Sequence, residues 1–235
     1  MVTFRGTEIQ DPRDLATDLN VEPTSMSSGL PGVLVHTGFL KTANLGIQAL
    51  RVYLDRIKND PNAEVMLTGH SLGGAAATIA AAQLGDLGVP REKISVYAFG
   101  APAVGNGAFQ RRYADLKVWR IDRPNDPVPK LLDNTITGFR HIGQEGILDS
   151  DQVTFDPPRR PGLIGRFLNG VRTLLGLFGL GRERNLSLAD HRRDGYRAAI
   201  AQAGVAGQAV PAATVPLVAQ PPQAAQPISG PLPTA

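Results

Sequence analysis

Residues 65–77 read VMLTGHSLGGAAA, and this stretch decides the predicted fold. The apolar run Glu64–Thr68 has the length of a short buried strand, and it breaks at Gly69. The small and apolar residues of Leu72–Leu87 predict a helix that can lie close to neighbouring strands. The pattern Gly69-His70-Ser71-Leu72-Gly73 therefore falls at a strand-to-helix turn.

A serine in such a turn is a candidate nucleophile. Backbone strain at a sharp strand-to-helix turn pushes the hydroxyl of Ser71 out of the sheet, and a Cβ at either flanking position would strike the turn. The helix N-terminus also directs N–H groups and its positive dipole end at the reacting centre. The alternative is a glycine-rich turn of a nucleotide-binding fold. No lysine follows the glycines and the sequence holds no Gly-x-Gly-x-x-Gly, which disfavours phosphate binding.

Strands and helices alternate along the rest of the chain, which predicts an α/β fold with a mainly parallel, doubly wound sheet and helices on both faces. A strand as close to the start as Val2–Phe4 predicts that N-terminal elements of such a fold are missing. The further strands are predicted at Ile94–Phe99, Val118–Ile121 and Phe139–Leu148, and the further helices at Lys41–Asn59, Phe109–Asp115 and Asp190–Ala203.

The acid of a serine nucleophile is expected to come next along the chain, because an α/β-hydrolase fold carries its residues in the order Ser, acid, His. Asp126 fits this order, since it follows the strand Val118–Ile121 in a turn bracketed by prolines. The alternative role for Asp126 is that of a turn-capping residue. Asp122 and Asp133 are less well placed, one at the end of the strand and the other in a later loop.

Four histidines compete for the role of the base. His36 and His70 precede the acid, and His70, inside the turn, is expected to point away from the hydroxyl of Ser71. His141 lies in a predicted strand, where a packed or hydrogen-bonded ring is expected. His191 follows a loop and opens a helix, so the order of the three residues favours it as the base.

The composition limits the classes of protein and of chemistry that fit this chain. A chain of 235 residues that is 42% hydrophobic and 19% charged is typical of a globular protein. A net charge of +3 is too small to indicate nucleic acid as a partner. The absence of cysteine excludes disulfides, thiolate catalysis and cysteine-ligated zinc. The sequence shows neither a signal peptide nor an apolar run of about eighteen residues, and it assigns no compartment.

The chain is predicted to divide into a hydrolase domain over residues 1–203 and a C-terminal tail over 204–235. The tail is rich in Ala, Pro and Gln without charge or periodicity, which predicts disorder.

An amphipathic segment, Leu163–Leu180, allows three interpretations. It is a core helix, part of an acyl-binding wall or second lid, or a helix on a membrane surface. In the last case, nearby arginines would meet anionic headgroups: Arg159, Arg160, Arg166, Arg172, Arg182 and Arg184.

Several short motifs, in this order and at this spacing, resemble the class 3 lipases, which include the fungal triacylglycerol lipases and related plant and bacterial acyl hydrolases. The resemblance covers roughly residues 2 to 200. It rests on Phe4-Arg5-Gly6-Thr7, His36-Thr37-Gly38-Phe39, Gly69-His70-Ser71-Leu72-Gly73-Gly74, Phe99-Gly100-Ala101-Pro102 with Val104-Gly105-Asn106, Asn125-Asp126-Pro127-Val128-Pro129, Phe139-Arg140-His141-Ile142-Gly143-Gln144-Glu145, and Asp190-His191 followed by Tyr196.

The resemblance implies a serine carboxylic ester hydrolase acting on lipid or other acyl esters through an acyl-enzyme, with no metal or cofactor. It implies Ser71, Asp126 and His191 as the catalytic triad and an oxyanion hole at Thr7 and Leu72. The alternative is a catalytically inactive module of this fold that binds lipid or a protein partner.

Three features depart from the family pattern. Ala103 stands where many members carry Arg, and relatives carry a long segment before the oxyanion loop. The lid region between Thr7 and His36 is polar, which disfavours strong interfacial activation. The acyl length and headgroup of the substrate stay open.

Overall fold

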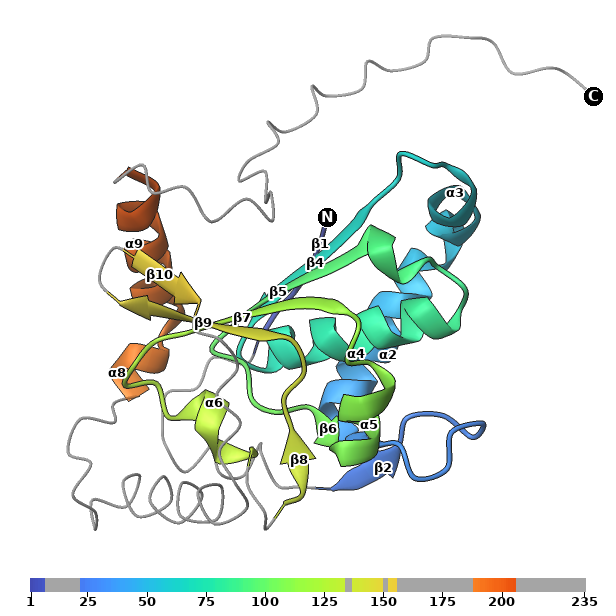
Figure 1. Cartoon of the computed structure of the whole chain (residues 1–235), viewed down its shortest axis with the longest axis horizontal. Coiled ribbons are helices and arrows are strands. Elements are labelled where there is room, and N and C mark those ends of the chain that lie inside the picture. The colour runs from blue at the N-terminus through green and yellow to red at the C-terminus, as the bar shows by residue number, and fades with distance from the viewer. Residues whose placement is uncertain (7–21, 134–136, 150–151, 156–187, 206–235) are drawn as a thin grey trace, which may run out of the picture.

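The computed structural model describes residues 1–6, 22–133, 137–149, 152–155 and 188–205. These residues form two sheets and the helices that pack on them (Figure 1). Thr7, the amphipathic segment 163–180 and the tail from residue 206 onward lie outside the described residues. In the described ranges, no helix combines the length and the apolar character needed to cross a membrane.

The larger sheet has six strands in the order β1-β4-β5-β7-β9-β10. The first five run parallel, and only β10 pairs antiparallel, with β9. The prediction of a mainly parallel sheet is thereby confirmed. The strands are β1 (Val2–Phe4), β4 (Val65–His70), β5 (Ile94–Phe99), β7 (Lys117–Asp122), β9 (Gln144–Asp149) and β10 (Gln152–Phe155).

Helices cover both faces of this sheet, as the alternation along β5 requires. Val96 and Ala98 point to the face covered by α4 (Leu72–Asp86) and are buried there. The next residue, Phe99, points to the opposite face and packs against Tyr196 of α9 (Arg193–Val205). Successive side chains of a strand point to opposite faces, so α4 and α9 lie on opposite faces of the sheet, with α9 near the edge formed by β9 and β10 (Figure 1).

Small residues let α4 approach the strands closely. A Cβ on Gly73 would lie 2.3 Å from the carbonyl oxygen of Phe4 in β1, a distance that real side chains do not reach. Phe4 in turn pairs with Gly69 of β4. The first turn of α4 is therefore fixed at the carboxyl ends of two parallel strands, β1 and β4.

A second, antiparallel sheet was not predicted. Its strands are two or three residues long, too short to show a periodicity. Asn106 links it to its surroundings, since its side-chain amide donates to the carbonyl of Gly32 at 2.8 Å and its Oδ1 accepts from the N–H of Phe109 at 3.0 Å. The order is β2 (Pro23–Ser25), β3 (Leu34–His36), β6 (Gly105–Asn106) and β8 (Phe139–Arg140).

The prediction of one strand over Phe139–Leu148 was wrong. The segment forms β8 in the small sheet and β9 in the large one, with a break between them. Gly143 causes the break: its φ of +81° lies in the left-handed region, and a Cβ there would lie 2.2 Å from the carbonyl oxygen of Val118.

The predicted helix over Lys41–Asn59 is divided and begins earlier than expected. It starts at Thr37 because Nδ1 of His36 accepts the N–H of Gly38 at 3.1 Å and so caps the helix. The remaining helical elements are α2 (Thr37–Leu50), η1 (Arg51–Tyr53), α3 (Leu54–Asn59), η2 (Arg91–Lys93), α5 (Gly107–Arg112), α6 (Val128–Leu131) and α8 (Leu188–His191).

Candidate active site

Ser71 occupies a strained position between β4 and α4. Its φ of +57° is the one positive value among the described residues other than glycine, and such a conformation costs on the order of 1–3 kcal/mol. The N–H of Ser71 donates to the carbonyl of Phe99 at 2.9 Å, which fixes the turn to β5. A Cβ on Gly69 would lie 2.3 Å from the carbonyl carbon of Gly73. The flanking glycines are therefore required by contact, as the sequence argument expected.

Three side chains predicted from the sequence lie in one hydrogen-bonded row. Nε2 of His191 lies 2.9 Å from Oγ of Ser71, and Nδ1 lies 3.0 and 2.9 Å from the two carboxylate oxygens of Asp126. The three residues are between 0 and 4% exposed. They come from the β4–α4 turn, the loop after β7 and the end of α8, which are 55 or more residues apart in pairs along the chain. This row can move a proton away from the hydroxyl of Ser71.

Asp126 is held by two further donors. Its Oδ1 accepts the N–H of Val128 at 2.8 Å, and its Oδ2 accepts the hydroxyl of Tyr196 at 2.7 Å. The same hydroxyl accepts the N–H of Arg123 at 2.9 Å. Burial, and next the charge of Asp126, raise the pKa of Tyr196, so the phenol keeps the proton that it donates.

Tyr196 had no role in the sequence argument. It was known only as part of the resemblance, five residues after His191. A buried tyrosine needs a partner for its hydroxyl, and this need was the one available signal that it joins the polar row.

His70 lies closer to the site than expected. Its ring centre is 4.7 Å from that of His191 and 5.2 Å from that of Tyr196. The expectation that His70 turns away from the serine overlooked this neighbour, because α8 and α9 approach the turn only in the folded chain. Burial, and next the nearby His191, lower the pKa of His70 to about 4. A neutral ring therefore packs beside His191 near neutral pH.

Two backbone donors were expected to face the oxyanion. Leu72 is the first residue of α4, and the N–H groups of the first helical turn have no partner within the helix itself. Its N–H therefore lies directly after Ser71 and is free of the helix ladder. Thr7 lies outside the described residues.

The other histidine candidates have structural partners. His36 caps α2 and stacks on Phe39 with ring centres 4.1 Å apart. Nε2 of His141 lies 2.7 Å from the carbonyl oxygen of Pro129, and burial lowers the pKa of His141 well below its ordinary value. His141 is hydrogen-bonded as expected, but in the connection between β8 and β9 and not within a strand.

Asp122, an alternative acid, is the last residue of β7 and points into the interior. Its carboxylate lies 3.6 Å from Nη1 of Arg120, an ion pair too long to count as a hydrogen bond. Burial raises the pKa of Asp122 to about 7 against the opposing effect of Arg120, with smaller contributions from Glu145 and Asp126. Asp133, the other alternative, follows α6 (Val128–Leu131). It is Asp126 that bonds to His191.

Replacing Asp122 by asparagine is expected to make the protein less sensitive to alkaline pH. The folded pKa of about 7 lies above the ordinary value of 3.8, so the folded state retains a proton that the unfolded state loses, and stability falls as pH rises through this interval. Between pH 5 and pH 8.5 the wild type should lose roughly 3 kcal/mol from this group, and Asp122→Asn should not. Urea unfolding at both pH values measures the difference.

The matched control is Asp115→Asn, since the Asp115 side chain is 63% exposed and pairs with Arg91. Its effect on the free energy of unfolding should be the same at pH 5 and pH 8.5. A parallel pH dependence of the wild type and Asp122→Asn would contradict the assignment.

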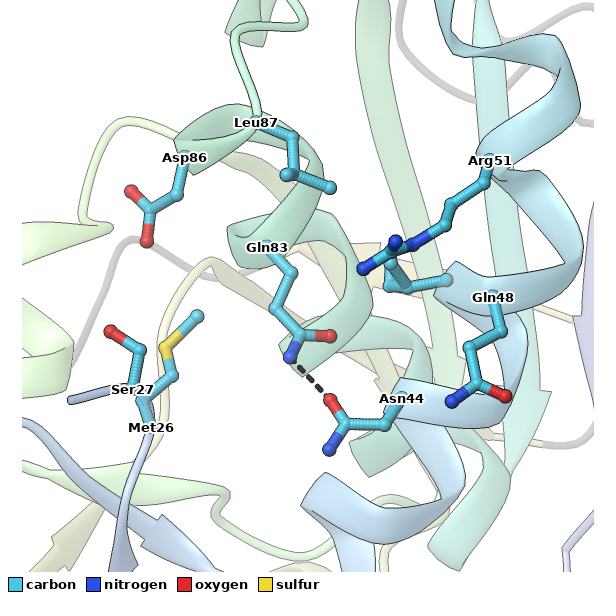
Figure 2. Close-up of a pocket in the computed structure, with 9 residues that line it drawn as sticks. Met26, Ser27, Asn44, Gln48, Arg51, Gln83, Asp86 and Leu87 are labelled. Carbon is cyan, nitrogen blue, oxygen red and sulfur yellow. Dashed lines mark hydrogen bonds between the residues drawn. The ribbon is translucent and has the colours of Figure 1, made fainter. Parts of the chain in front are cut away.

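A separate groove of about 430 Å³ lies between α2 and α4 (Figure 2). Gln83 donates to Asn44 across it at 2.7 Å, and Arg51 and Leu87 lie along its edge. Gln83 stands twelve residues beyond Ser71 along α4, which corresponds to roughly 18 Å. The groove is therefore distinct from the row of Ser71, His191 and Asp126.

Within the described part of the chain, no three His, Asp or Glu side chains are grouped so as to hold a metal ion.

The parallel sheet, with a serine between one of its strands and the following helix, defines an α/β-hydrolase fold. A model of the family Lipase (class 3) matches residues 1–135, and the chain belongs to this family.

Relatives and solved structures agree with this family. A secreted mono- and diacylglycerol lipase 1 of Fusarium solani is 34% identical over 150 residues, which are 59% of this chain and 43% of that protein. A phospholipase A1 EG1, chloroplastic/mitochondrial, of Oryza sativa subsp. indica is 31% identical over 188 residues, 65% of this chain and 43% of that protein. The crystal structure of a lipase from Rhizopus microsporus var. chinensis superposes with a TM-score of 0.60 at 27% identity.

That superposition covers 80% of this chain and 62% of the Rhizopus lipase. The chain spans less than half the length of the two curated relatives. Both relatives are named as lipases or phospholipases, which are carboxylic ester hydrolases.

Proposed function

We propose that this protein is a serine hydrolase that cleaves carboxylic esters of lipids through an acyl-enzyme. The observation that carries the proposal is the hydrogen-bonded row from Oγ of Ser71, in its strained turn, through His191 to the buried Asp126. A serine within reach of an imidazole that is itself oriented by a carboxylate is the arrangement that acyl transfer needs.

In the proposed first half-reaction, Oγ of Ser71 attacks the ester carbonyl carbon while Nε2 of His191 takes the hydroxyl proton. His191 then gives that proton to the departing alcohol oxygen as the ester C–O bond breaks. In the second half, His191 takes a proton from the water that attacks the acyl carbon. His191 then returns this proton to Oγ of Ser71 as the bond between Oγ and the acyl carbon breaks and the carboxylic acid leaves.

Asp126 keeps the proton of His191 on Nδ1 and stabilises the imidazolium that forms during each half-reaction. Val128 and Tyr196 keep the carboxylate oriented, since both donate to it. The N–H of Leu72, with that of Thr7, is proposed to stabilise the negative oxygen of the tetrahedral intermediate.

The proposed substrate class is an acyl ester of a glycerolipid. The two relatives are named for different substrates, acylglycerols in one case and phospholipids in the other. Both kinds of lipid contain acyl ester bonds. Peripheral membrane contact through residues 163–180 stays a prediction, as does the division into a domain over 1–203 and a disordered tail over 204–235.

A fluorophosphonate probe tests the proposal directly, because it reacts only with a serine that is activated as a nucleophile. We expect the native protein to be labelled, and peptide mass mapping to place the label on Ser71. Heat-denatured protein serves as the control and should stay unlabelled. A native protein that is not labelled would favour the alternative, an inactive module that binds lipid or a protein partner.

A further inference from the structure

The position of His191 depends on contacts outside its own helix. Helix α8 (Leu188–His191) is four residues long, one turn, and a helix of this length is not stable by itself in water. His191 is its last residue, and Arg192 separates it from α9. The distance between His191 and Ser71 must therefore be set by whatever holds α8 against the rest of the fold.

Besides the bond of His191 to Asp126, two contacts of Arg123 hold α8 to the rest of the fold. Its Nη1 lies 3.0 Å from Oδ1 of Asp190 and donates to the carbonyl oxygen of Asp190 at 3.4 Å. Asp190 directly precedes His191, so both contacts act on the neighbouring residue of the base. The two side chains are 26% and 22% exposed, and a partly buried pair is screened less by water and salt than a surface pair.

The same arginine belongs to the turn that carries the acid. The N–H of Asp126 donates to the carbonyl of Arg123 at 3.1 Å, which closes the turn over these four residues. The N–H of Arg123 donates to Tyr196 at 2.9 Å. Arg123 therefore bonds to three segments: helix α8, which carries His191, helix α9, and the turn that carries Asp126.

Helix α9 leaves space for the guanidinium at Gly195. A Cβ at this position would lie 2.6 Å from Nη1 of Arg123. Gly195 lies in the first turn of α9, and any larger residue there would have to displace the end of the Arg123 side chain.

We infer that the ion pair between Arg123 and Asp190 positions His191 for its proton transfer with Ser71, a role that rests on the proposed function. Arg123 is a positioning residue, since it acts through Asp190 and the turn of Asp126 and not on the substrate. Loss of the ion pair should slow the chemical step, because a displacement of the reacting groups by about 1 Å can lower a rate by about 100-fold.

Substituting either partner tests the inference. Arg123→Gln and Asp190→Asn are each expected to lower kcat for a short-chain p-nitrophenyl ester by about 10- to 100-fold, with KM changed by less than about twofold. The double variant should be no slower than the slower single variant, because the two substitutions remove one shared contact. Arg123→Lys should recover part of kcat, since a lysine can still reach one oxygen of Asp190.

The matched control is Arg112→Gln, which removes an ion pair with Asp86 at 3.2 Å at the far end of α4 and should leave kcat unchanged. Thermal unfolding of each variant shows whether it folds. A folded Arg123→Gln with the kcat of the wild type would overturn the inference, as would losses that multiply in the double variant. Fluorophosphonate labelling of the wild type keeps the two proposals apart, because an unlabelled wild type contradicts the proposed function and a labelled one leaves only the role of Arg123 under test.

Discussion

Replacing Ser71 by alanine is expected to lower kcat for ester hydrolysis by about a million-fold, the size of effect seen when a serine nucleophile is removed. The variant keeps the turn but lacks the Oγ that lies 2.9 Å from Nε2 of His191. No other described side chain shares this combination of strained turn, imidazole partner and helix N-terminus. The measurement is steady-state hydrolysis of a short-chain p-nitrophenyl ester by both proteins.

The variant should fold like the wild type, because alanine and serine both carry a Cβ and bear a similar strain at the φ of +57°. Ser28→Ala is the matched control, since Ser28 is an exposed residue before β3 (Leu34–His36), and it should keep full activity. Hydrolysis by Ser71→Ala within about tenfold of the wild type would mean that another group is the nucleophile.

Replacing Asp126 by asparagine is expected to lower kcat by about 10,000-fold without displacing the residue. The carboxylate accepts three donors, from His191, Val128 and Tyr196, and is fully buried. An asparagine side chain offers one acceptor oxygen and one NH₂ donor, so it cannot accept all three. With the NH₂ group toward Nδ1, His191 must carry its proton on Nε2, the nitrogen that has to receive the proton of Ser71.

Ester hydrolysis by Asp126→Asn measures this effect, and the rate of fluorophosphonate labelling at Ser71 should fall along with it. Asp133→Asn is the control, because Asp133 was the later of the two alternative acids in the sequence. A fall of less than about tenfold for Asp126→Asn, together with a larger fall for Asp133→Asn, would assign the acid to Asp133.

The sequence was informative where the structure depends on near neighbours. The strand-to-helix turn at residues 65–77, the strand β5 and the helix α4 follow from apolar periodicity and glycine placement, and the structure has them within one or two residues of the prediction. The turn also restricts which residue can stand at position 69, since any Cβ there would collide with the backbone of Gly73.

The sequence was misleading where a single residue interrupts a pattern. Phe139–Leu148 has the composition of one strand, but Gly143 divides it between two sheets because the carbonyl of Val118 occupies the space beside it. The helix over Lys41–Asn59 begins at Thr37 because His36 caps it, and a histidine cap has no strong signal in the sequence.

By itself, the sequence determined the α/β class, the serine turn and the order of Ser71, Asp126 and His191 as candidates. These features depend on local sterics and on the order of residues, both of which can be read along the chain. Only the tertiary structure decided that the ring of His70 packs beside His191, that Tyr196 donates to Asp126 and that Arg123 holds Asp190. Those contacts join residues 67 to 121 positions apart, and such pairs form only when the chain has packed its helices on both faces of the sheet.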